Sequence, residues 1–190
     1  MNLKQDLIFA RVTAEQMSDY LHAEVLFYPV GSIDGVQMPQ LTIGTWLETE
    51  WRLAALRDRY PNEIGEVLPA AQAEVRKIRH RLPDQYQHKA RREFKSRLDS
   101  WEMFLNDRQD ATAQPEPYNA PRSGYADRVH TRFRLELLKD DVSQLGDQVS
   151  RLRMLDGRLR MRFKPGEFIW EPELAPAAPA DKYWFLYARL

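Results

Sequence analysis

The feature that most constrains the fold of this chain is a series of apolar residues at heptad spacing in its second half. Steps of four and three residues alternate along the series, which is the pattern of a helix that packs lengthwise against another helix. The spacing predicts one long helix over Tyr125–Asp156, with Gly157 as its left-handed C-terminal cap. The predicted helix-pairing seam consists of Leu138, Val142, Leu145, Val149 and Leu152.

This seam needs a partner helix, and the chain offers one. A second amphipathic stripe is formed by Tyr86, Ala90, Phe94, Leu98, Trp101 and Leu105. We predict that helices at about 84–109 and 124–156 form a long antiparallel pair, joined by a Pro-rich loop over 110–123. Self-association, or docking of another protein's helix, is the alternative. Asp156 ends the clean repeat after about two heptads, and this short length favours pairing within the chain.

The first part of the chain predicts a mixture of helices and extended segments. Thr13 and Thr45 each begin a capping-box pattern, which predicts a helix start at each position. Leu7–Val12 and Val25–Val30 are rich in apolar residues, and the second also in aromatic and β-branched ones, so both are expected to be extended. The glycines and proline of Gly31–Gly44 predict a loop.

After residue 157 the apolar period changes from 3.6 to 2. Apolar and arginine residues alternate over 158–163, which predicts a strand. Lys164–Glu167 has Pro and Gly at its centre and predicts a turn, so that 168–170 returns as the second strand of a β-hairpin. The apolar run Tyr183–Leu190 predicts a further strand.

Together these patterns predict a mostly helical α+β fold. The expected architecture is a helical bundle with a long antiparallel helix pair and a small C-terminal antiparallel sheet. A hydrophobic fraction of 43% and five Trp are sufficient for a core. The predicted division is a helical domain over 1–157, with the hairpin and last strand of 158–190 packing on the same core.

Composition excludes several classes of protein. The chain has no Cys, which rules out disulfide scaffolds, thiolate zinc sites and a Cys nucleophile. It has no stretch of about 18 apolar residues and no signal-peptide pattern, so neither a membrane span nor secretion is expected. The expectation is a cytoplasmic protein without a membrane partner.

The formal net charge is zero, but the charges are segregated along the sequence. Residues 76–97 hold nine Lys or Arg and two acids, and residues 151–164 hold six and one. Clustered cations are what phosphate binding requires, whereas a solvated helix or strand face is the plain alternative. The candidate polyanion-binding residues are Arg76, Lys77, Arg79, Arg81, Lys89, Arg91, Arg92 and Lys95 on the first segment, and Arg158, Arg160 and Arg162 on the predicted hairpin.

No recognisable catalytic, cofactor or metal pattern occurs. Nucleotide-binding glycine loops and the serine nucleophile elbow are missing. Asp19 and His22 stand three residues apart, but a metal site needs further ligands, so the pair is expected to be a surface interaction. We therefore expect no catalytic residues, no cofactor and no metal, and we lean against an enzyme.

Two functions follow from these patterns. The first is a non-catalytic interaction or assembly protein that acts through helical surfaces on another protein or on itself. The second is a nucleic-acid-binding protein that uses the basic segment 76–97 and the cationic face of 158–164.

Overall fold

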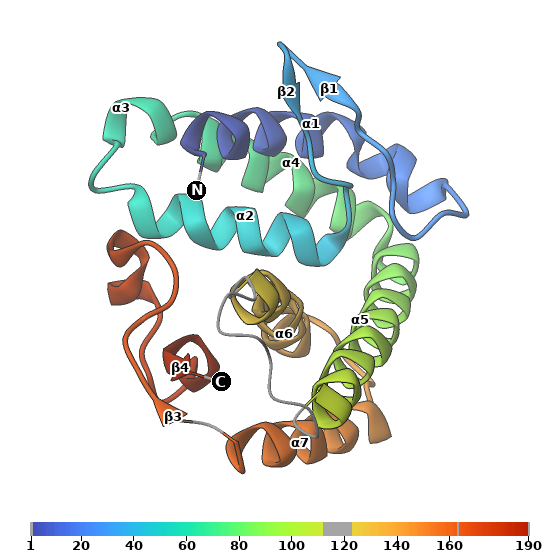
Figure 1. Ribbon diagram of the computed structural model, residues 1–190. Coiled ribbons are helices and arrows are strands. Elements are labelled where there is room, and N and C mark those ends of the chain that lie inside the picture. The colour runs from blue at the N-terminus through green and yellow to red at the C-terminus, as the bar shows by residue number, and fades with distance from the viewer. Residues whose placement is uncertain (1, 112–122, 163, 190) are drawn as a thin grey trace. The chain divides into compact units, whose positions relative to one another are not determined.

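The mostly helical α+β fold class is confirmed (Figure 1). The computed structural model describes residues 2–111, 123–162 and 164–189, with the side chains of 107–111, 123, 188 and 189 left out. The described part of the chain contains seven α-helices, two short 3₁₀ helices and four two-residue strands. No helix in this part is both long and apolar enough to cross a lipid bilayer.

The chain divides into two compact units, Met1–Glu93 and Phe94–Leu190. Helix α5 (Pro83–Ala111) contains the boundary between them. The division predicted between 157 and 158 concerned helical and β content, and it stays a prediction.

In the first unit, α1 (Leu3–His22) packs against α2 (Ile43–Leu56) and α4 (Val67–Arg81), and the short α3 (Pro61–Ile64) precedes α4. The predicted strand over Leu7–Val12 is wrong, because it lies inside α1.

The helix α1 begins earlier than predicted. The side chain of Asn2 accepts a hydrogen bond from the backbone N–H of Gln5 at 3.2 Å and caps the helix there. Thr13, predicted as a cap, is therefore buried in the middle of α1. The short apolar run over 7–12 predicts a strand by composition. In the structure its Phe9, Ala10 and Val12 are instead buried with helical spacing.

The start of α2 is also displaced from the prediction. Thr42 is its N-cap, three residues before Thr45, and its hydroxyl accepts from the Thr45 N–H at 3.0 Å. The predicted loop Gly31–Gly44 contains a hairpin of β1 (Ser32–Ile33) and β2 (Val36–Gln37).

An Asp-Gly turn makes this hairpin. Asp34 and Gly35 have φ values of 50° and 74°, as a two-residue hairpin turn requires, and Asp-Gly is the sequence signal for it. The segment predicted as extended before it, Val25–Val30, contributes a single bridge from Tyr28 to Leu41.

The amphipathic stripe predicted on α5 is confirmed. Its six residues are all buried: Tyr86, Ala90, Phe94, Leu98, Trp101 and Leu105. Steps of four and three therefore identified the inner face of this helix correctly.

The single long helix predicted over Tyr125–Asp156 is wrong. It is two helices, α6 (Ser123–Asp141) and α7 (Asp147–Arg160). The link contains Gln144 with φ 61° and Gly146 with φ 51°, which are left-handed values that interrupt a right-handed helix. Apolar spacing alone missed the break, because Val142 and Leu145 in the link are buried as well.

The predicted hairpin over 158–170 is wrong too. Helix α7 continues through Gly157 to Arg160, since Leu152, Leu155 and Leu159 are buried with helical spacing. Gly157 is therefore not a C-terminal cap.

A small C-terminal antiparallel sheet is present. Strand β3 (Lys164–Pro165) pairs with β4 (Ala188–Arg189), so the chain end was correctly assigned to a sheet. Most of the predicted last strand is the 3₁₀ helix η2 (Trp184–Tyr187), and η1 (Pro172–Ala177) precedes it. The predicted positions Phe163, Leu190 and 112–122 of the Pro-rich loop lie outside the described residues.

Candidate interaction surfaces

The basic segment 76–97 lies on the last turns of α4 and on the first half of α5. Three of its cations make no hydrogen bond, ion pair or ring contact with the described residues: Arg76 and Lys95, which are exposed, and Arg91, which is half-buried. Arg91 and Lys95 are four residues apart on α5, so they follow one another on the same side of the helix.

Lys89 points inward rather than toward solvent. Its Nζ donates to the backbone carbonyls of Ala23 and Val25 at 2.5 and 2.6 Å and lies 4.8 Å from the ring centroid of Tyr20. Burial, with a smaller contribution from Arg92, lowers the pKa of the Lys89 amine. Lys89 thus holds the chain just after α1, where carbonyls lack helical partners.

Other cations of this segment also have internal contacts. The guanidinium of Arg79 lies 4.5 Å from the ring centroid of Tyr86, Arg81 donates to the Ser18 hydroxyl at 3.1 Å, and Lys77 pairs with Glu74 at 3.3 Å. Arg97 is buried. Part of the segment therefore stabilises the fold.

An exposed aromatic closely follows the stretch of chain that this segment contacts. Arg92 donates to the carbonyl of Glu24 at 3.4 Å, and together with Lys89 it holds the segment that follows α1 against α5. On that segment Val25 and Phe27 are 49% and 38% exposed. The ring of Phe27 is accessible to solvent, whereas the ring of Tyr86 is buried.

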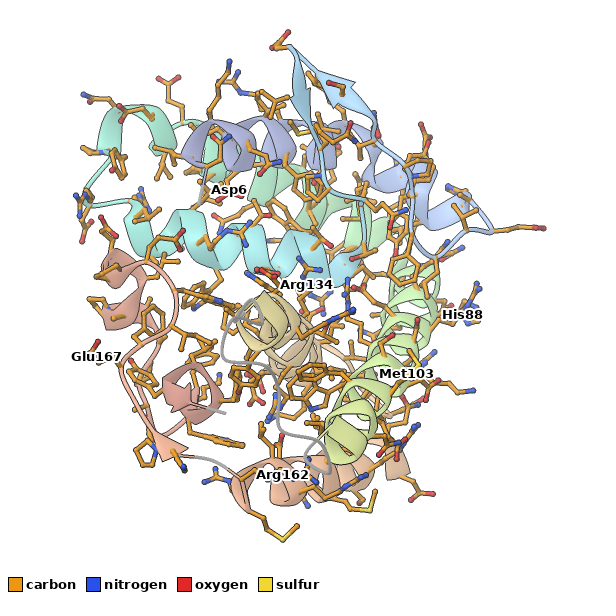
Figure 2. The ribbon with its side chains drawn as sticks, viewed as in Figure 1. Asp6, His88, Met103, Arg134, Arg162 and Glu167 are labelled. Atoms are coloured by element: carbon orange, nitrogen blue, oxygen red, sulfur yellow. The ribbon has the colours of Figure 1, made fainter. Side chains whose placement is uncertain are left out.

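The cationic face predicted for 158–164 is not a strand face. Arg158, on α7, donates to Asn106 at 2.7 Å. The guanidinium of Arg160 lies 3.8 Å from the ring centroid of Trp184. Arg162, labelled in Figure 2, is exposed beyond the end of α7 and makes no ion pair with the described residues.

The predicted pairing seam is spread over three segments. Leu138 lies on α6, Val142 and Leu145 lie in the link, and Val149 and Leu152 lie on α7. All but the half-buried Val149 are buried. The seam is therefore not one continuous helical stripe, because the link interrupts it.

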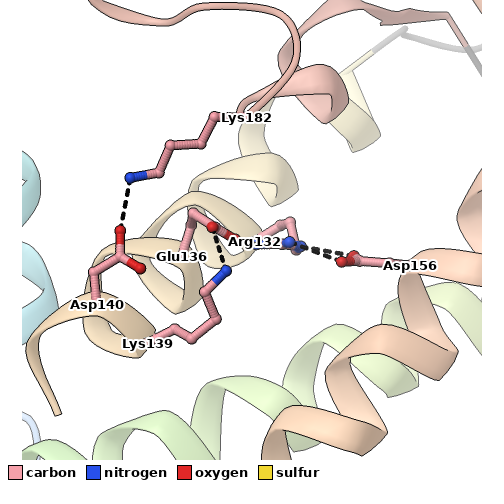
Figure 3. A network of polar contacts seen from close by, with 6 residues as sticks. All are labelled: Arg132, Glu136, Lys139, Asp140, Asp156 and Lys182. Atoms are coloured by element: carbon pink, nitrogen blue, oxygen red, sulfur yellow. Dashed lines mark hydrogen bonds and ion pairs between the residues drawn. The ribbon is translucent and has the colours of Figure 1, made fainter.

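The second unit contains a buried charge network that the sequence analysis missed (Figure 3). Arg132 donates to both carboxylate oxygens of Asp156 at 2.7 and 2.8 Å and to Glu136 at 2.9 Å. Lys139 also bonds Glu136, and a separate, exposed pair joins Lys182 to the carboxylate of Asp140 at 2.7 Å.

The surroundings of Arg132 favour its charged form. Burial by itself lowers the pKa of Arg132, but the hydrogen bonds and negative charges of Asp156 and Glu136 outweigh burial and raise it. The guanidinium also lies 4.4 Å from the ring centroid of Phe185. All of its surroundings are accounted for by packing and ion pairing within the chain, as in a structural network.

A second buried carboxylate stabilises the start of α2. Glu93 is fully buried on α5, where it accepts hydrogen bonds from the Thr42 hydroxyl at 2.7 Å and the Gly44 N–H at 2.9 Å. It thereby satisfies backbone and side-chain donors that a helix N-terminus leaves open.

A third group joins α1 to α2. Arg52 donates to both oxygens of Asp6 at 2.6 and 3.0 Å and to Glu48 at 2.6 Å. Figure 2 labels Asp6 on α1. Glu48, the acid three residues after Thr45 in the predicted capping box, is instead fully buried against Arg52.

The missed charges share one sequence signal. Glu93 follows buried Ala90 by three residues, and Arg132 follows buried Val129 by three. Both therefore occupy positions that the helical period assigns to the core. A charged residue at such a position predicts a buried ion pair or hydrogen bond.

The described residues hold no candidate metal cluster, but they line an open depression. No group of three or more possible metal ligands occurs there, and Asp19 and His22 are both exposed on α1. An open depression of about 360 Å³ is lined mainly by Leu3, Leu7 and Ile8 of α1 with charges of both signs beside them. None of the groups with a shifted pKa lines it.

No protein-family model matches the sequence, and no curated protein and no solved structure shows significant similarity to it. Function is therefore argued from the surfaces and buried groups of this chain alone.

Proposed function

We propose that this chain is a non-catalytic interaction or assembly protein that acts through helical surfaces. The supporting observation is a set of exposed apolar side chains, of which Met103 (labelled on α5 in Figure 2), Met154 and Met161 are 61%, 53% and 79% exposed. Met is adaptable and is enriched at surfaces that bind other proteins. The cytoplasm is the proposed location, on the sequence grounds given above.

The use of charge inside the fold supports the same proposal. Hydrogen bonds and ion pairs that connect helices occupy the charged groups of Arg132, Glu93 and Arg52. Catalytic groups are instead expected in a cleft with strongly perturbed pKa values and a free face toward substrate.

Sizing chromatography tests this proposal. The purified chain, of 22.4 kDa, is measured by light scattering, and the chain in a native cell extract is followed on the same column by immunoblot. We expect a larger size in the extract than for the purified monomer, or self-association of the purified chain. A monomer mass in both samples would contradict the proposal.

A second candidate function is nucleic-acid binding by the basic segment 76–97. The observation that favours it is exposed Phe27, three residues after Glu24, whose carbonyl accepts from Arg92, because single strands bind to cations together with rings on which bases stack. The acids Asp19, Glu24 and Asp84 are also exposed in this part of the chain and weaken the local positive field.

Fluorescence anisotropy with a labelled single-stranded oligonucleotide tests this second candidate. Binding is expected to weaken steeply with salt and to be lost after Arg91, Arg92 and Lys95 are all changed to Glu. The matched control changes Lys4, Arg11 and Arg57, which are exposed cations outside the segment, to Glu. Equal losses for the two triple variants would show an effect of net charge only.

A further inference from the structure

The exposed side of α7 carries a short heptad pattern of its own. Ser150, Met154, Gly157 and Met161 follow one another at steps of four, three and four, and all four are exposed. Met161 directly follows α7 with helical backbone angles, φ −64° and ψ −21°, so the pattern stays on one side of the helix. We name these four residues the outer seam.

The outer seam is distinct from the face that holds α7 in the second unit. Leu152, Leu155 and Leu159 are buried and lie on the opposite side of the helix. The side chains of the outer seam are therefore available without unpacking the unit.

The outer seam alternates small and large residues. Ser150 and Gly157 leave room for the backbone of a neighbouring helix, and Met154 and Met161 are flexible apolar side chains that fill gaps. A Cβ added to Gly157 would meet nothing within 4 Å. Glycine inside a helix is destabilising relative to alanine, and no packing within the described chain requires it here.

Arginines flank the outer seam on both sides. On one side Arg151 pairs with Asp99 at 2.6 Å and with Glu102, and Arg158 bonds Asn106, so both are held by α5. On the other side Arg153 makes no ion pair with the described residues, and Arg160 stacks on Trp184. In helix pairs, residues at these flanking positions select the partner by charge.

This charge pattern disfavours a second copy of the chain as the occupant. Two outer seams facing each other would place the flanking arginines of one copy among those of the other, and like charges across a helix pair are destabilising. A partner helix with Glu or Asp at its flanking positions is complementary to Arg153 and Arg160.

Other anionic partners fit the surface less well. Interfacial membrane helices bury a broad face of Leu, Phe or Trp, whereas the leucines of α7 point inward and its outer apolar side chains are two Met. Nucleic acid gains from exposed rings, and Trp184 under Arg160 is only 9% exposed.

We propose that the outer seam of α7 docks an acidic amphipathic helix of another protein. This inference rests on the proposed function, for which it names the surface and the chemistry of the partner.

Fluorescence anisotropy with a synthetic peptide tests the inference. The probe is about 18 residues long, enough to form helix, with Leu at heptad spacing and Glu at the flanking positions. We expect saturable binding by the full chain, and a Kd raised about tenfold or more when Met154 and Met161 are both changed to Ser. Arg153→Glu should also weaken binding and reduce its dependence on salt.

Gly157→Trp provides a variant that keeps the fold. Trp is a better helix residue than Gly, and the position has open space, so circular dichroism and thermal unfolding should match or exceed those of the wild type. The bulky ring should nevertheless block approach of the peptide. The matched controls are Val25→Ser, an exposed apolar residue of the first unit, and Arg128→Glu, an exposed arginine of α6, and both should bind like the wild type.

Three results would overturn the inference: no binding of the peptide, equal binding by wild type and Gly157→Trp, or stronger binding of an oligonucleotide or of anionic vesicles with loss on Gly157→Trp. The proposed function is judged separately. If the chain has a larger size in native extract and Gly157→Trp does not change that size, the protein has a partner but the outer seam does not bind it.

Discussion

At the residue scale, this chain places charged side chains where helical periodicity expects apolar ones. Arg132 and Glu93 are both buried and both bonded to groups on another helix or at a helix start. A buried charge with its partners in place contributes little net stability, but one left without its partner is strongly destabilising.

Arg132→Met should therefore be costly. The substitution leaves Asp156 and Glu136 without the guanidinium that both accept from, and the expected loss is about 3–5 kcal/mol of unfolding free energy in urea. The control Lys77→Gln breaks a pair whose side chains are 70% and 42% exposed, and it should cost no more than about 1 kcal/mol. Similar losses for both variants would refute a structural role for the buried network.

Tyr183 gives a prediction for alkaline pH. Burial raises the pKa of its phenol above the ordinary value of about 10, and the neighbouring Lys182 opposes this only in part. Because the pKa is raised in the folded chain, the contribution of the neutral phenol to the unfolding free energy is complete below about pH 10. That contribution is lost as pH rises through the folded pKa.

The variant Tyr183→Phe has no phenol to ionise. Between about pH 9 and 11.5 its unfolding free energy should fall less than that of the wild type, and the difference between the two curves isolates this residue among the other tyrosines and lysines. Urea unfolding across this range is the measurement. Parallel curves would mean that Tyr183 ionises as easily in the folded chain as in the unfolded one.

At the element scale, the link between α6 and α7 divides what the sequence predicts as one helix into two. Gly146 has φ 51° and ψ −129°, a conformation that residues with a Cβ rarely adopt, and an added Cβ meets no other atom within 4 Å. The cost of a substitution there is therefore conformational rather than steric.

Gly146→Ala should lower the unfolding free energy by about 1–2 kcal/mol. The paired variant is Gln144→Gly, which relieves a left-handed φ of 61° and should stay within about 1 kcal/mol of the wild type, on the stabilising side. Urea unfolding of both variants is the test. A neutral Gly146→Ala would mean that the link can adopt another conformation at no cost.

Elements with strong local signals were predictable from sequence, and elements set by tertiary contacts were not. The stripe of α5 follows one period over its whole length, so its inner face was identified correctly. The break at 142–146 was missed because the link buries Val142 and Leu145 in the register of a continuous helix. The alternation over 158–163 resembled a strand, but burial of Leu159 with Leu152 and Leu155 selected helix.

The candidate surfaces were predictable only in part. The basic segment was visible as composition, but sequence did not show that Lys89 is turned toward the carbonyls of Ala23 and Val25. Neither did it show that Phe27 is exposed or that Arg92 bonds the carbonyl of Glu24, because that bond joins residues far apart in the chain. The sequence did not indicate the outer seam, because its pattern predicts that the helix ends at Gly157.

At the scale of the whole molecule, the charges sum to a formal net charge of zero but differ in whether they have partners inside the chain. Those with partners inside the chain, such as Arg132 and Arg151, connect helices. Among those without an ion pair to the described residues, Arg153 and Arg162 are exposed at α7 and just beyond it. We propose that these two arginines, with the exposed methionines, serve binding rather than stability.

Comparative capture from native extract tests this claim most directly. Tagged wild type, Gly157→Ala and Gly157→Trp are used as baits, and the recovered proteins are quantified by mass spectrometry. The account predicts a protein with an acidic helical segment that wild type and Gly157→Ala retain and Gly157→Trp loses, although all three baits are folded. Recovery of the same proteins in the same amounts by all three baits would contradict it.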